Sequence, residues 1–399
     1  MVSAPRVVIV GGGHAGFHAA IFLRSGSWPG EVTVIDAQAQ PPYQRPPLSK
    51  DFLAGKQELA DGEFRPASFY PEHGIELITG ERVAAIDRTA RTVAFAGRAP
   101  IRYDELVLAT GSRPRALPVP GAELDGVQFL VTRDDAAALR ERLTTAERIV
   151  VIGGGFIGLE TAAVAATAGK RVTIFEAADR LMVRGVSEPM SRYFEELHRS
   201  HGSRVVLSSP VAAIEGAGGR VRAVVTADGT REKADLVITG IGVVPNDDLA
   251  ANAGLVTGDG ILVDSWLRTS DARIFAIGDC ARFSTRYAAD VPSVRLESVQ
   301  NATDQARFLA QRLHDGFTAA AYDAVPWFWT EQFGRRLQIA GLTSGFDRFD
   351  QVSAGDGQFS IFCYRGETLL GCESVNSPRD HMRARRTLAA VEAPVAPRP

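Results

Sequence analysis

The chain has 399 residues, of which 45% are hydrophobic and 23% are charged, and its formal net charge is −3. This length predicts two or three domains, and the near balance of charge excludes the basic excess that is typical of nucleic-acid-binding proteins. No apolar run approaches the roughly 18 residues of a transmembrane helix, and the three cysteines include no CxxC pair, so we expect a cytoplasmic protein without a metal site and without nucleic-acid or membrane partners.

The first predicted elements form a β-α-β unit around a glycine-rich turn. The apolar run Arg6–Val10 is typical of a buried parallel strand. Gly11, Gly13 and Gly16 follow it, then a helix pattern, and then a second strand that ends in Asp36, 36 − 16 = 20 residues after the last glycine. In dinucleotide-binding folds the first glycine allows the tight turn, the second lets the backbone reach the pyrophosphate, and the third lets helix pack on strand. The helix N-terminus also presents free N–H groups to the phosphates.

The same order returns in the middle of the chain. The strand "RIVVI" precedes Gly153, Gly155 and Gly158, a helix pattern follows, and the next strand, "RVTIFE", ends in Glu176, 176 − 158 = 18 residues later. The repetition extends further, because "RVAAID" is echoed by "PVAAIE" and "YDELVLATG" by "KADLVITG". Each half therefore predicts a nucleotide-binding unit, an antiparallel meander and a return strand. Two dinucleotides held side by side allow a hydride to pass between them.

Four further motifs resemble those of the two-dinucleotide flavoprotein reductases. "ATGSRP" (109–114) and "GVVPN" (242–246) are similar to the crossings between their domains, and "IFAIGDCA" (274–281) is similar to their flavin strand. "PYQRPPLSK" (42–50), after which "LSKDFLAG" reads as a helix start, resembles the ferredoxin reductases of bacterial oxygenase systems, the putidaredoxin reductase and rhodocoxin reductase family. The resemblance continues through "VRLESVQNATDQA" and "VPWFWTEQFG" and so covers nearly the whole chain.

The resemblance implies an α/β fold with two Rossmann-like, three-layer dinucleotide-binding domains, each with a β-meander, and a small C-terminal α+β domain. The expected FAD-binding domain is discontinuous (1–113 and 246–321), the inserted NAD-binding domain spans 114–245, and the C-terminal domain spans 322–399. Ser377 and Asp380 predict a capping box at the last helix, and the tail "APVAPRP" is expected to be disordered. We expect a monomer, because obligate disulfide-reductase dimers have a longer interface domain here.

The resemblance also implies roles at the cofactors. Lys50 is expected against the flavin near N5, with Glu160 as its ion partner when the nicotinamide is in place. Trp329 is expected beside the isoalloxazine, on the same strand face as Trp327. Asp279 would accept hydrogen bonds from the ribityl hydroxyls. The alternatives are that Lys50 is a surface side chain and that the tryptophans pack a core. The other residues expected at FAD or NADH are Gly11, Gly13, His14, Ala15, Gly16, Val83, Ala109, Thr110, Gly111, Arg133, Gly278, Val299, Gly153, Gly155, Phe156, Ile157, Gly158, Arg184 and Gly242.

The acid at the end of each second strand is a candidate contact for the adenosine ribose of its dinucleotide. Glu176 favours NADH over NADPH, because a carboxylate accepts from the 2′-OH and repels a 2′-phosphate. Arg180 and Arg184 are close enough in sequence to oppose this preference. In the first half, either Asp36 or the backbone near Ala37 meets the FAD ribose, and the sequence leaves both open.

The absence of cysteine between residues 35 and 53 predicts that no thiol relay accepts electrons from the flavin. We therefore predict an FAD-dependent NADH:ferredoxin oxidoreductase that reduces a [2Fe-2S] ferredoxin serving a haem-thiolate cytochrome monooxygenase or a Rieske-type oxygenase. Ferredoxins are usually acidic, so the docking candidates are Arg65, Arg307, Arg335 and Arg336. The alternatives are an NADH oxidoreductase that uses rubredoxin, a quinone-like molecule or oxygen, and an apoptosis-inducing-factor-like protein in which NADH binding recruits partners.

Overall fold

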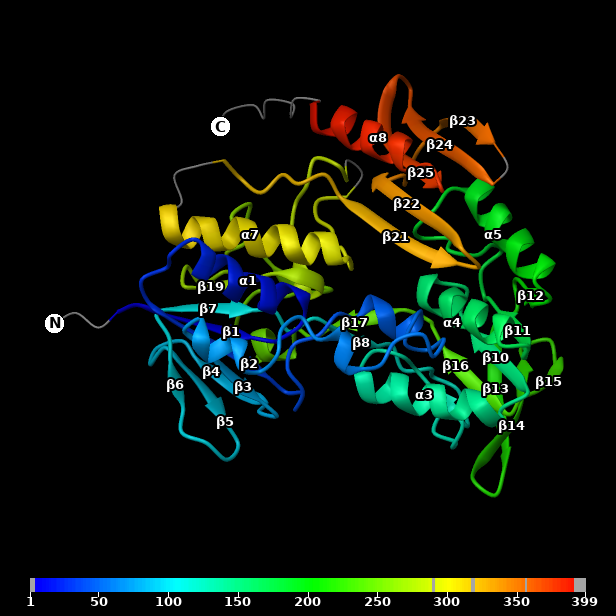
Figure 1. Cartoon of the computed structure of the whole chain (residues 1–399), viewed down its shortest axis with the longest axis horizontal. Coiled ribbons are helices and arrows are strands. Elements are labelled where there is room, and N and C mark those ends of the chain that lie inside the picture. Colours follow the sequence, from blue (N-terminus) through cyan, green and yellow to red (C-terminus); the bar gives the residue numbers. More distant parts are fainter. Residues whose placement is uncertain (1–3, 289–290, 317–319, 356, 391–399) are drawn as a thin grey trace.

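The computed structural model describes residues 4–288, 291–316, 320–355 and 357–390 (Figure 1). The tail that was predicted to be disordered, 393–399, lies outside the described residues. Within the described part of the chain, no helix combines the length and the apolar character that a transmembrane span requires.

The first parallel sheet contains, in spatial order, β3 (Ile75–Thr79), β2 (Glu31–Asp36), β1 (Arg6–Val10), β7 (Glu105–Leu108) and β19 (Ile274–Ala276). The helices α1 (His14–Ser25) and α7 (Val299–Asp315) cover one face, and the meander β4 (Val83–Asp87), β5 (Thr92–Phe95) and β6 (Ile101–Arg102) covers the other (Figure 1). Val7 and Ile9 of β1 pack with the helices, whereas Val8 and Val10 pack with the meander. Burial on both faces explains the uninterrupted apolar run of β1.

The second parallel sheet repeats this layering. Its strands are β12 (Arg204–Val206), β11 (Arg171–Phe175), β10 (Arg148–Ile152), β16 (Leu236–Thr239) and β9 (Val127–Gln128). Ile149 and Val151 pack with α3 (Arg133–Thr145), α4 (Phe156–Thr167) and α5 (Glu188–Ser200). Val150 and Ile152 pack with the meander β13 (Val211–Ala217), β14 (Arg220–Thr226) and β15 (Arg231–Lys233). The prediction of two Rossmann-like layered units is therefore confirmed.

Two short strands join the halves. β8 (Ser112–Pro114) and β17 (Val243–Pro245) pair in antiparallel fashion, so the two crossings predicted from "ATGSRP" and "GVVPN" lie side by side. The first sheet is then completed by a strand, β19, that comes after the second unit in sequence. The remaining short elements are α2 (Phe69–Glu72), α6 (Asp248–Asn252), β18 (Ile261–Leu262), β20 (Ala281–Arg282) and the 3-10 turns η1 (Pro46–Ser49), η2 (Ala60–Gly62) and η3 (Gly278–Cys280).

The C-terminal part is an antiparallel sheet with the strand order β21 (Trp327–Gln332), β22 (Arg335–Gly341), β25 (Thr368–Val375), β24 (Gln358–Arg365) and β23 (Arg348–Gly355). Its last element is α8 (Pro378–Ala390). Leu337 and Ile361 pack with the core of α4 and α5, whereas Phe362 and Cys372 pack with α8. The sheet is thus held between α8 and the second unit (Figure 1).

Two local predictions were wrong. The helix expected at "LSKDFLAG" is the single 3-10 turn η1 followed by turns, and Lys50 leaves the helical region with φ −125° and ψ −106°. α8 begins at Pro378 as expected, but no capping box forms, because Asp380 accepts a hydrogen bond from Ser360 and the buried Ser377 hydroxyl has no partner among the described residues.

Candidate functional site

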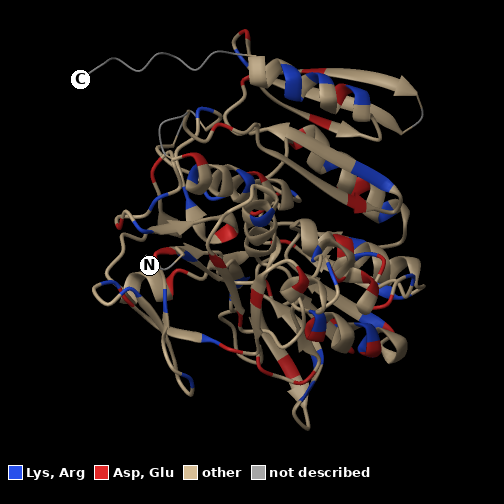
Figure 2. Cartoon of the chain, turned by 60° about the vertical axis from the view of Figure 1, so that its left-hand side comes forward, with Lys and Arg blue, Asp and Glu red and all other residues tan. Residues whose placement is uncertain are grey.

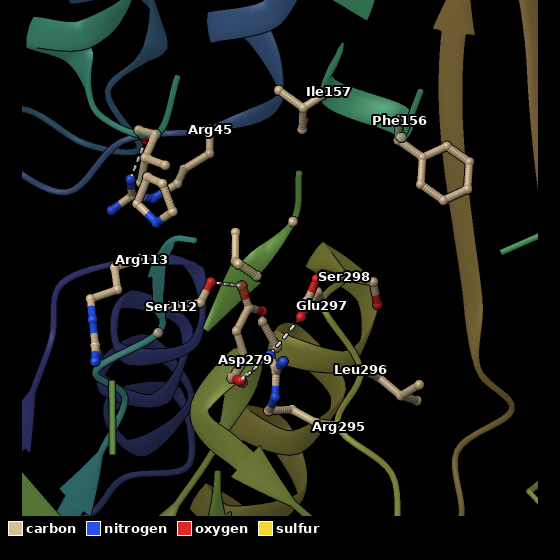
Figure 3. A pocket seen from close by; sticks show the side chains of 18 of the residues that line it. Arg45, Ser112, Arg113, Phe156, Ile157, Asp279, Arg295, Leu296, Glu297 and Ser298 are labelled. Atoms are coloured by element: carbon tan, nitrogen blue, oxygen red, sulfur yellow. Dashed lines mark hydrogen bonds and ion pairs between the residues drawn. The ribbon is translucent and has the colours of Figure 1, made fainter. Parts of the chain in front are cut away.

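A cavity of about 1720 Å³ lies between the two glycine-rich turns and the C-terminal sheet. Pockets for one small ligand usually measure roughly 300–1,000 Å³, so this cavity has room for more than one. Figure 3 shows Arg45 and Ile157 on one side of it and Ser112, Asp279 and Leu296 on the other. Residues from η1, α4 and β21 also line it, so the first unit, the second unit and the C-terminal sheet all contribute to the cavity wall.

The first glycine of each motif makes a turn that other residues would strain. Gly11 has φ +111° and Gly153 has φ +103°, both in the region that favours glycine. A Cβ atom would lie 2.1 Å from the Ala109 oxygen in the first turn and 2.5 Å from the Gly240 oxygen in the second. Each turn is therefore pressed against the return strand of its own sheet.

The second glycine of each motif faces open space. A Cβ atom on Gly13 would meet no atom within 4 Å, and one on Gly155 would meet only the Gly240 oxygen, at 3.6 Å. Both glycines line the cavity, directly before the N-termini of α1 and α4. An added methyl group would occupy the space beside the helix N-terminus, which is where a pyrophosphate binds in such turns. The residues present fit two dinucleotides.

The third glycine of each motif does not line the cavity and serves packing, as predicted. A Cβ atom on Gly16 would lie 1.8 Å from the Gly11 oxygen, and one on Gly158 would lie 2.4 Å from the Gly153 oxygen. These contacts leave no room for a side chain between helix and turn.

The acids after the second strands hold the glycine turns. Asp36 accepts from the backbone N–H groups of Gly12 and Gln38, at 3.1 and 3.0 Å. Glu176 accepts in the same way from Gly154 at 2.6 Å and from Ala178 at 2.8 Å. Burial raises the pKa of Asp36 above its usual value, and these backbone N–H groups oppose the rise. In both halves, therefore, a carboxylate that accepts hydrogen bonds from two backbone N–H groups fixes the glycine turn.

Lys50 and Glu160 meet at the centre of the cavity wall. The Lys50 Nζ lies 2.6 Å from Glu160 Oε2, and Ser49 Oγ donates to the same oxygen at 2.5 Å. Thr330 Oγ1 donates to the other oxygen, Oε1, at 2.6 Å. Glu160 is only 2% exposed, and charges buried to this degree are stable when they are paired and hydrogen-bonded. Lys50 and Glu160 therefore form an ion pair in the structure itself.

Two tryptophans form a wall beside this pair. Trp327 and Trp329 of β21 share one face, with ring centroids 5.5 Å apart, and both line the cavity. Behind Trp327 lie the buried His381 ring, at 5.5 Å, and the Arg385 guanidinium, at 5.1 Å from the ring centroid. The wall is partly exposed to the cavity rather than enclosed in a core.

Asp279 is another residue that lines the cavity. It accepts from Ser112 Oγ at 3.2 Å, and the surrounding protein and the nearby Glu297 raise its pKa to about 6. Arg295 donates to the Asp279 backbone oxygen at 3.2 Å and pairs with Glu297 at 2.6 Å (Figure 3). An acceptor poised beside open space suits a chain of ligand hydroxyls.

Besides Gly16 and Gly158, one further predicted cofactor residue, Arg133, does not line the cavity. Arg133 is buried, pairs with Glu63 at 3.2 Å and stacks on Tyr43, whereas Arg45 lines the cavity. Periodicity placed Arg133 at the start of α3 but could not indicate where its long side chain turns. His14 does line the cavity, and burial together with nearby positive groups lowers its pKa to about 3, so it is neutral.

The four docking candidates do not form one patch. Arg65 stacks on Phe69, and Arg307 stacks on Phe22 of α1 while pairing with Asp304. Neighbours in a strand point to opposite faces: the Arg335 guanidinium lies beside Gly357, and Arg336 is near enough to His381 of α8 to lower the pKa of that ring. Figure 2 shows positions of positively and negatively charged residues interspersed along the ribbon in that view. The four arginines were predicted individually, and the sequence does not indicate which of their guanidinium groups lie close together in space.

The cysteines are inert in this fold. Cys280 is buried beside the first sheet and donates to the Leu108 oxygen at 3.4 Å. Burial raises the pKa of each thiol, to about 12 for Cys372, so a thiolate is disfavoured. None of the three is among the cavity-lining residues. Among the described residues, no cluster of His, Cys, Asp or Glu is placed to hold a metal ion.

The cavity brings together most of the residues predicted from the sequence and several that were missed. Arg45 and Ser49 line the cavity and were missed, although both lie inside "PYQRPPLSK". Thr330 was also missed; it is not among the lining residues but donates to Glu160, which is. The predicted residues that line the cavity are Gly11, Gly13, His14, Ala15, Asp36, Lys50, Val83, Ala109, Thr110, Gly111, Gly153, Gly155, Phe156, Ile157, Glu160, Glu176, Arg184, Gly242, Gly278, Asp279, Val299 and Trp329.

Comparisons with known proteins agree with this architecture. The pyridine nucleotide-disulphide oxidoreductase family matches residues 5–306, and the reductase C-terminal family matches 327–398. Rhodocoxin reductase from Rhodococcus erythropolis is 49% identical over 98% of this chain and 91% of that protein. A solved ferredoxin reductase for the CYP199A2 system from Rhodopseudomonas palustris has a TM-score of 0.93 and 44% identity, covering 97% of this chain and 95% of that one. The solved covalent putidaredoxin reductase–putidaredoxin complex has a TM-score of 0.92 and 38% sequence identity. The match covers 97% of this chain and 93% of that one.

Proposed function

This chain belongs to the pyridine nucleotide-disulphide oxidoreductase family, and from that premise we propose that it passes electrons from NADH through FAD to a [2Fe-2S] ferredoxin. It is an oxidoreductase that uses FAD and NAD(P)H. The observation that carries the proposal is the shared cavity, which is lined by both glycine motifs with the Lys50–Glu160 pair between them. FAD, when bound, accepts a hydride from the nicotinamide and supplies single electrons to an iron–sulfur protein.

The protein's own residues bind and orient the two groups. We assign the Gly11–Gly16 turn, Asp36 and Asp279 to FAD, and the Gly153–Gly158 turn and Glu176 to NADH. The Lys50 ammonium, held by Glu160, stabilises negative charge on the adjoining ring system. Trp329 closes the side of the cavity. The corresponding domains are 1–113 with 246–321 for FAD, 114–245 for NADH, and 322–399 at the C-terminus.

The surroundings of Glu176 support NADH as the reductant. Arg180 donates to the Val183 and Val186 carbonyl oxygens and to Ser191 Oγ, at 2.8–2.9 Å, so its guanidinium is engaged within its own loop. The Glu176 carboxyl group is fixed by two backbone N–H groups at the cavity edge. A 2′-phosphate would meet this carboxylate, whereas a 2′-OH can donate to it.

The electron exit is proposed at the tryptophan wall. The buried thiols cannot relay electrons, so reduction must pass to an external carrier. We propose Arg65, Arg307, Arg335 and Arg336 as docking contacts to be tested singly, because each has its own set of neighbours. The protomer is proposed to act as a monomer, and the ferredoxin is proposed to serve a haem-thiolate cytochrome or a Rieske-type oxygenase.

The test is cytochrome c reduction by NADH with a [2Fe-2S] ferredoxin, with rubredoxin and with no carrier. A rate that depends strongly on the ferredoxin supports the proposal. Equal rates without a carrier would indicate a small-molecule acceptor, a rate restored only by rubredoxin would indicate that carrier, and very slow turnover with reduced flavin would indicate an NADH-sensing interaction protein. Purified protein that takes up no FAD would refute all of these functions.

A further inference from the structure

A buried chain of side chains continues from Glu160 away from the cavity. Thr330 Oγ1 contacts Glu160 Oε1 at 2.6 Å, Gln332 Nε2 contacts Thr330 Oγ1 at 3.3 Å, and His198 Nε2 contacts Gln332 Oε1 at 2.9 Å. All four side chains are at most 2% exposed. They come from α4, β21 and α5, so the chain runs across the contact between the second unit and the C-terminal sheet.

The chemistry of the groups fixes the direction of every hydrogen bond. A carboxylate only accepts, so the Thr330 hydroxyl gives its single hydrogen to Glu160. The Thr330 oxygen must then accept from Gln332, which places the amide nitrogen of Gln332 there and its oxygen toward His198. An amide oxygen only accepts, so His198 donates from Nε2. The three bonds are therefore all donated toward Glu160.

His198 is suited to the end of such a chain. Burial lowers its pKa to about 4, so the ring is neutral and carries one hydrogen, which the contact to Gln332 places on Nε2. Its Nδ1 has no hydrogen-bond partner among the described residues. The ring is packed edge-on against Phe333 at 5.0 Å, which limits its rotation.

We propose that Thr330, Gln332 and His198 are positioning residues, a donor relay that holds the Glu160 carboxylate turned toward Lys50. The relay rests on the proposed function, because its purpose is to keep the Lys50 ammonium at the flavin. Oε1 is occupied by the relay, so Oε2 is left to Ser49 and Lys50. Aligned donors in a water-free interior reinforce one another and stabilise the buried charge.

The central test compares Thr330→Val with Thr330→Ser. Valine has the shape of threonine and suits a strand but lacks the donor, whereas serine keeps the hydroxyl. The first readout does not depend on activity: acetylation of Lys50 relative to the exposed Lys56, measured by peptide mass spectrometry on protein as purified. An amine held as an ammonium in an ion pair is acetylated slowly. We expect the Lys50/Lys56 ratio to rise at least about threefold in the valine variant and to stay near the wild-type value in the serine variant.

The second readout is the rate at which saturating NADH reduces the bound flavin, measured by stopped flow. Loss of one hydrogen bond to a charged group predicts a fall of about tenfold in the valine variant, largely recovered by serine, with less effect on the apparent NADH affinity. Gln332→Leu, which removes the next donor, should change both readouts in the same direction but less. Thermal midpoints and flavin content check that the variants are folded.

An unchanged acetylation ratio in Thr330→Val would overturn the relay, and so would an equal rise in the serine variant, since the effect would then come from packing. Failure of the proposed function looks different. Wild-type protein whose flavin is not reduced by NADH would refute that function, while the acetylation ratio would still decide whether the relay holds Lys50.

Discussion

The duplicated acids lead to a prediction about nicotinamide choice. Glu176→Ala removes two interactions at once: the acceptor for the Gly154 and Ala178 N–H groups, at 2.6 and 2.8 Å, and the negative charge beside the adenosine ribose. The first loss loosens the glycine turn for both nucleotides and should lower stability by about 2 kcal/mol. The second loss affects the two nucleotides differently, because only NADH donates a 2′-OH and only NADPH is repelled.

The differential effect sets the expected magnitude. A hydrogen bond to a charged group contributes about 1–3 kcal/mol, which corresponds to a roughly 5- to 150-fold change in the NADH/NADPH ratio. The ratio is obtained from second-order rate constants for flavin reduction, measured by stopped flow with each nucleotide below saturation. We expect the variant to lose rate with NADH and to gain or keep rate with NADPH.

Glu123→Ala is the matched control, because it removes the same charge from an exposed position outside the cavity lining. It should leave the ratio as in the wild type. If Glu176→Ala reduces both rates equally, so that the ratio stays within about twofold, Glu176 holds the turn but does not select the nucleotide, and the reasoning from charge is refuted.

Two further predictions concern the glycines and a buried histidine. Gly13→Ala and Gly155→Ala should fold, because an added Cβ atom meets open space at Gly13 and only a contact at 3.6 Å at Gly155. The Gly13 variant should lose FAD, whereas the Gly155 variant should keep FAD and bind NADH at least about tenfold more weakly. Flavin absorbance and NADH titration measure these effects, and two variants with the same defect would contradict the assignment of the turns. His381 is 2% exposed, has no hydrogen-bond partner for either ring nitrogen among the described residues, and has its pKa lowered to about 4 by burial and by nearby arginines. The unfolded chain takes up this proton near pH 6.5, so stability falls as the pH drops from there toward 4, by about 2 kcal/mol at pH 5. His381→Leu should therefore lose less in thermal midpoint between pH 7.5 and pH 5 than the wild type does, as followed by tryptophan fluorescence, and an identical loss would show that His381 does not carry this proton linkage.

The sequence by itself determined the repeated architecture. Strand, glycine turn, helix and acid-terminated strand follow one another within about 30 residues, and each depends on local spacing: apolar runs for two-sided burial, and glycines where a side chain would strike the neighbouring backbone. For this reason Gly11 and Gly153 were found in turns with positive φ, and Gly16 and Gly158 in close packing. The shared face of the tryptophans also follows from a local pattern, because alternate residues of a strand point to the same side.

Only the tertiary structure decided which side chains meet. Glu160 takes its partners from Ser49, 111 residues away, and from Thr330, 170 residues away, and neither separation has a period that a sequence pattern reveals. The same holds for Arg133, whose guanidinium turns to Glu63 instead of the cavity. A long side chain has several staggered rotamers of similar energy, and the one adopted depends on charged and bulky groups from other domains. The local sequence therefore determined the fold of each unit, whereas the packing of the three units around one cavity determined how its polar groups are arranged.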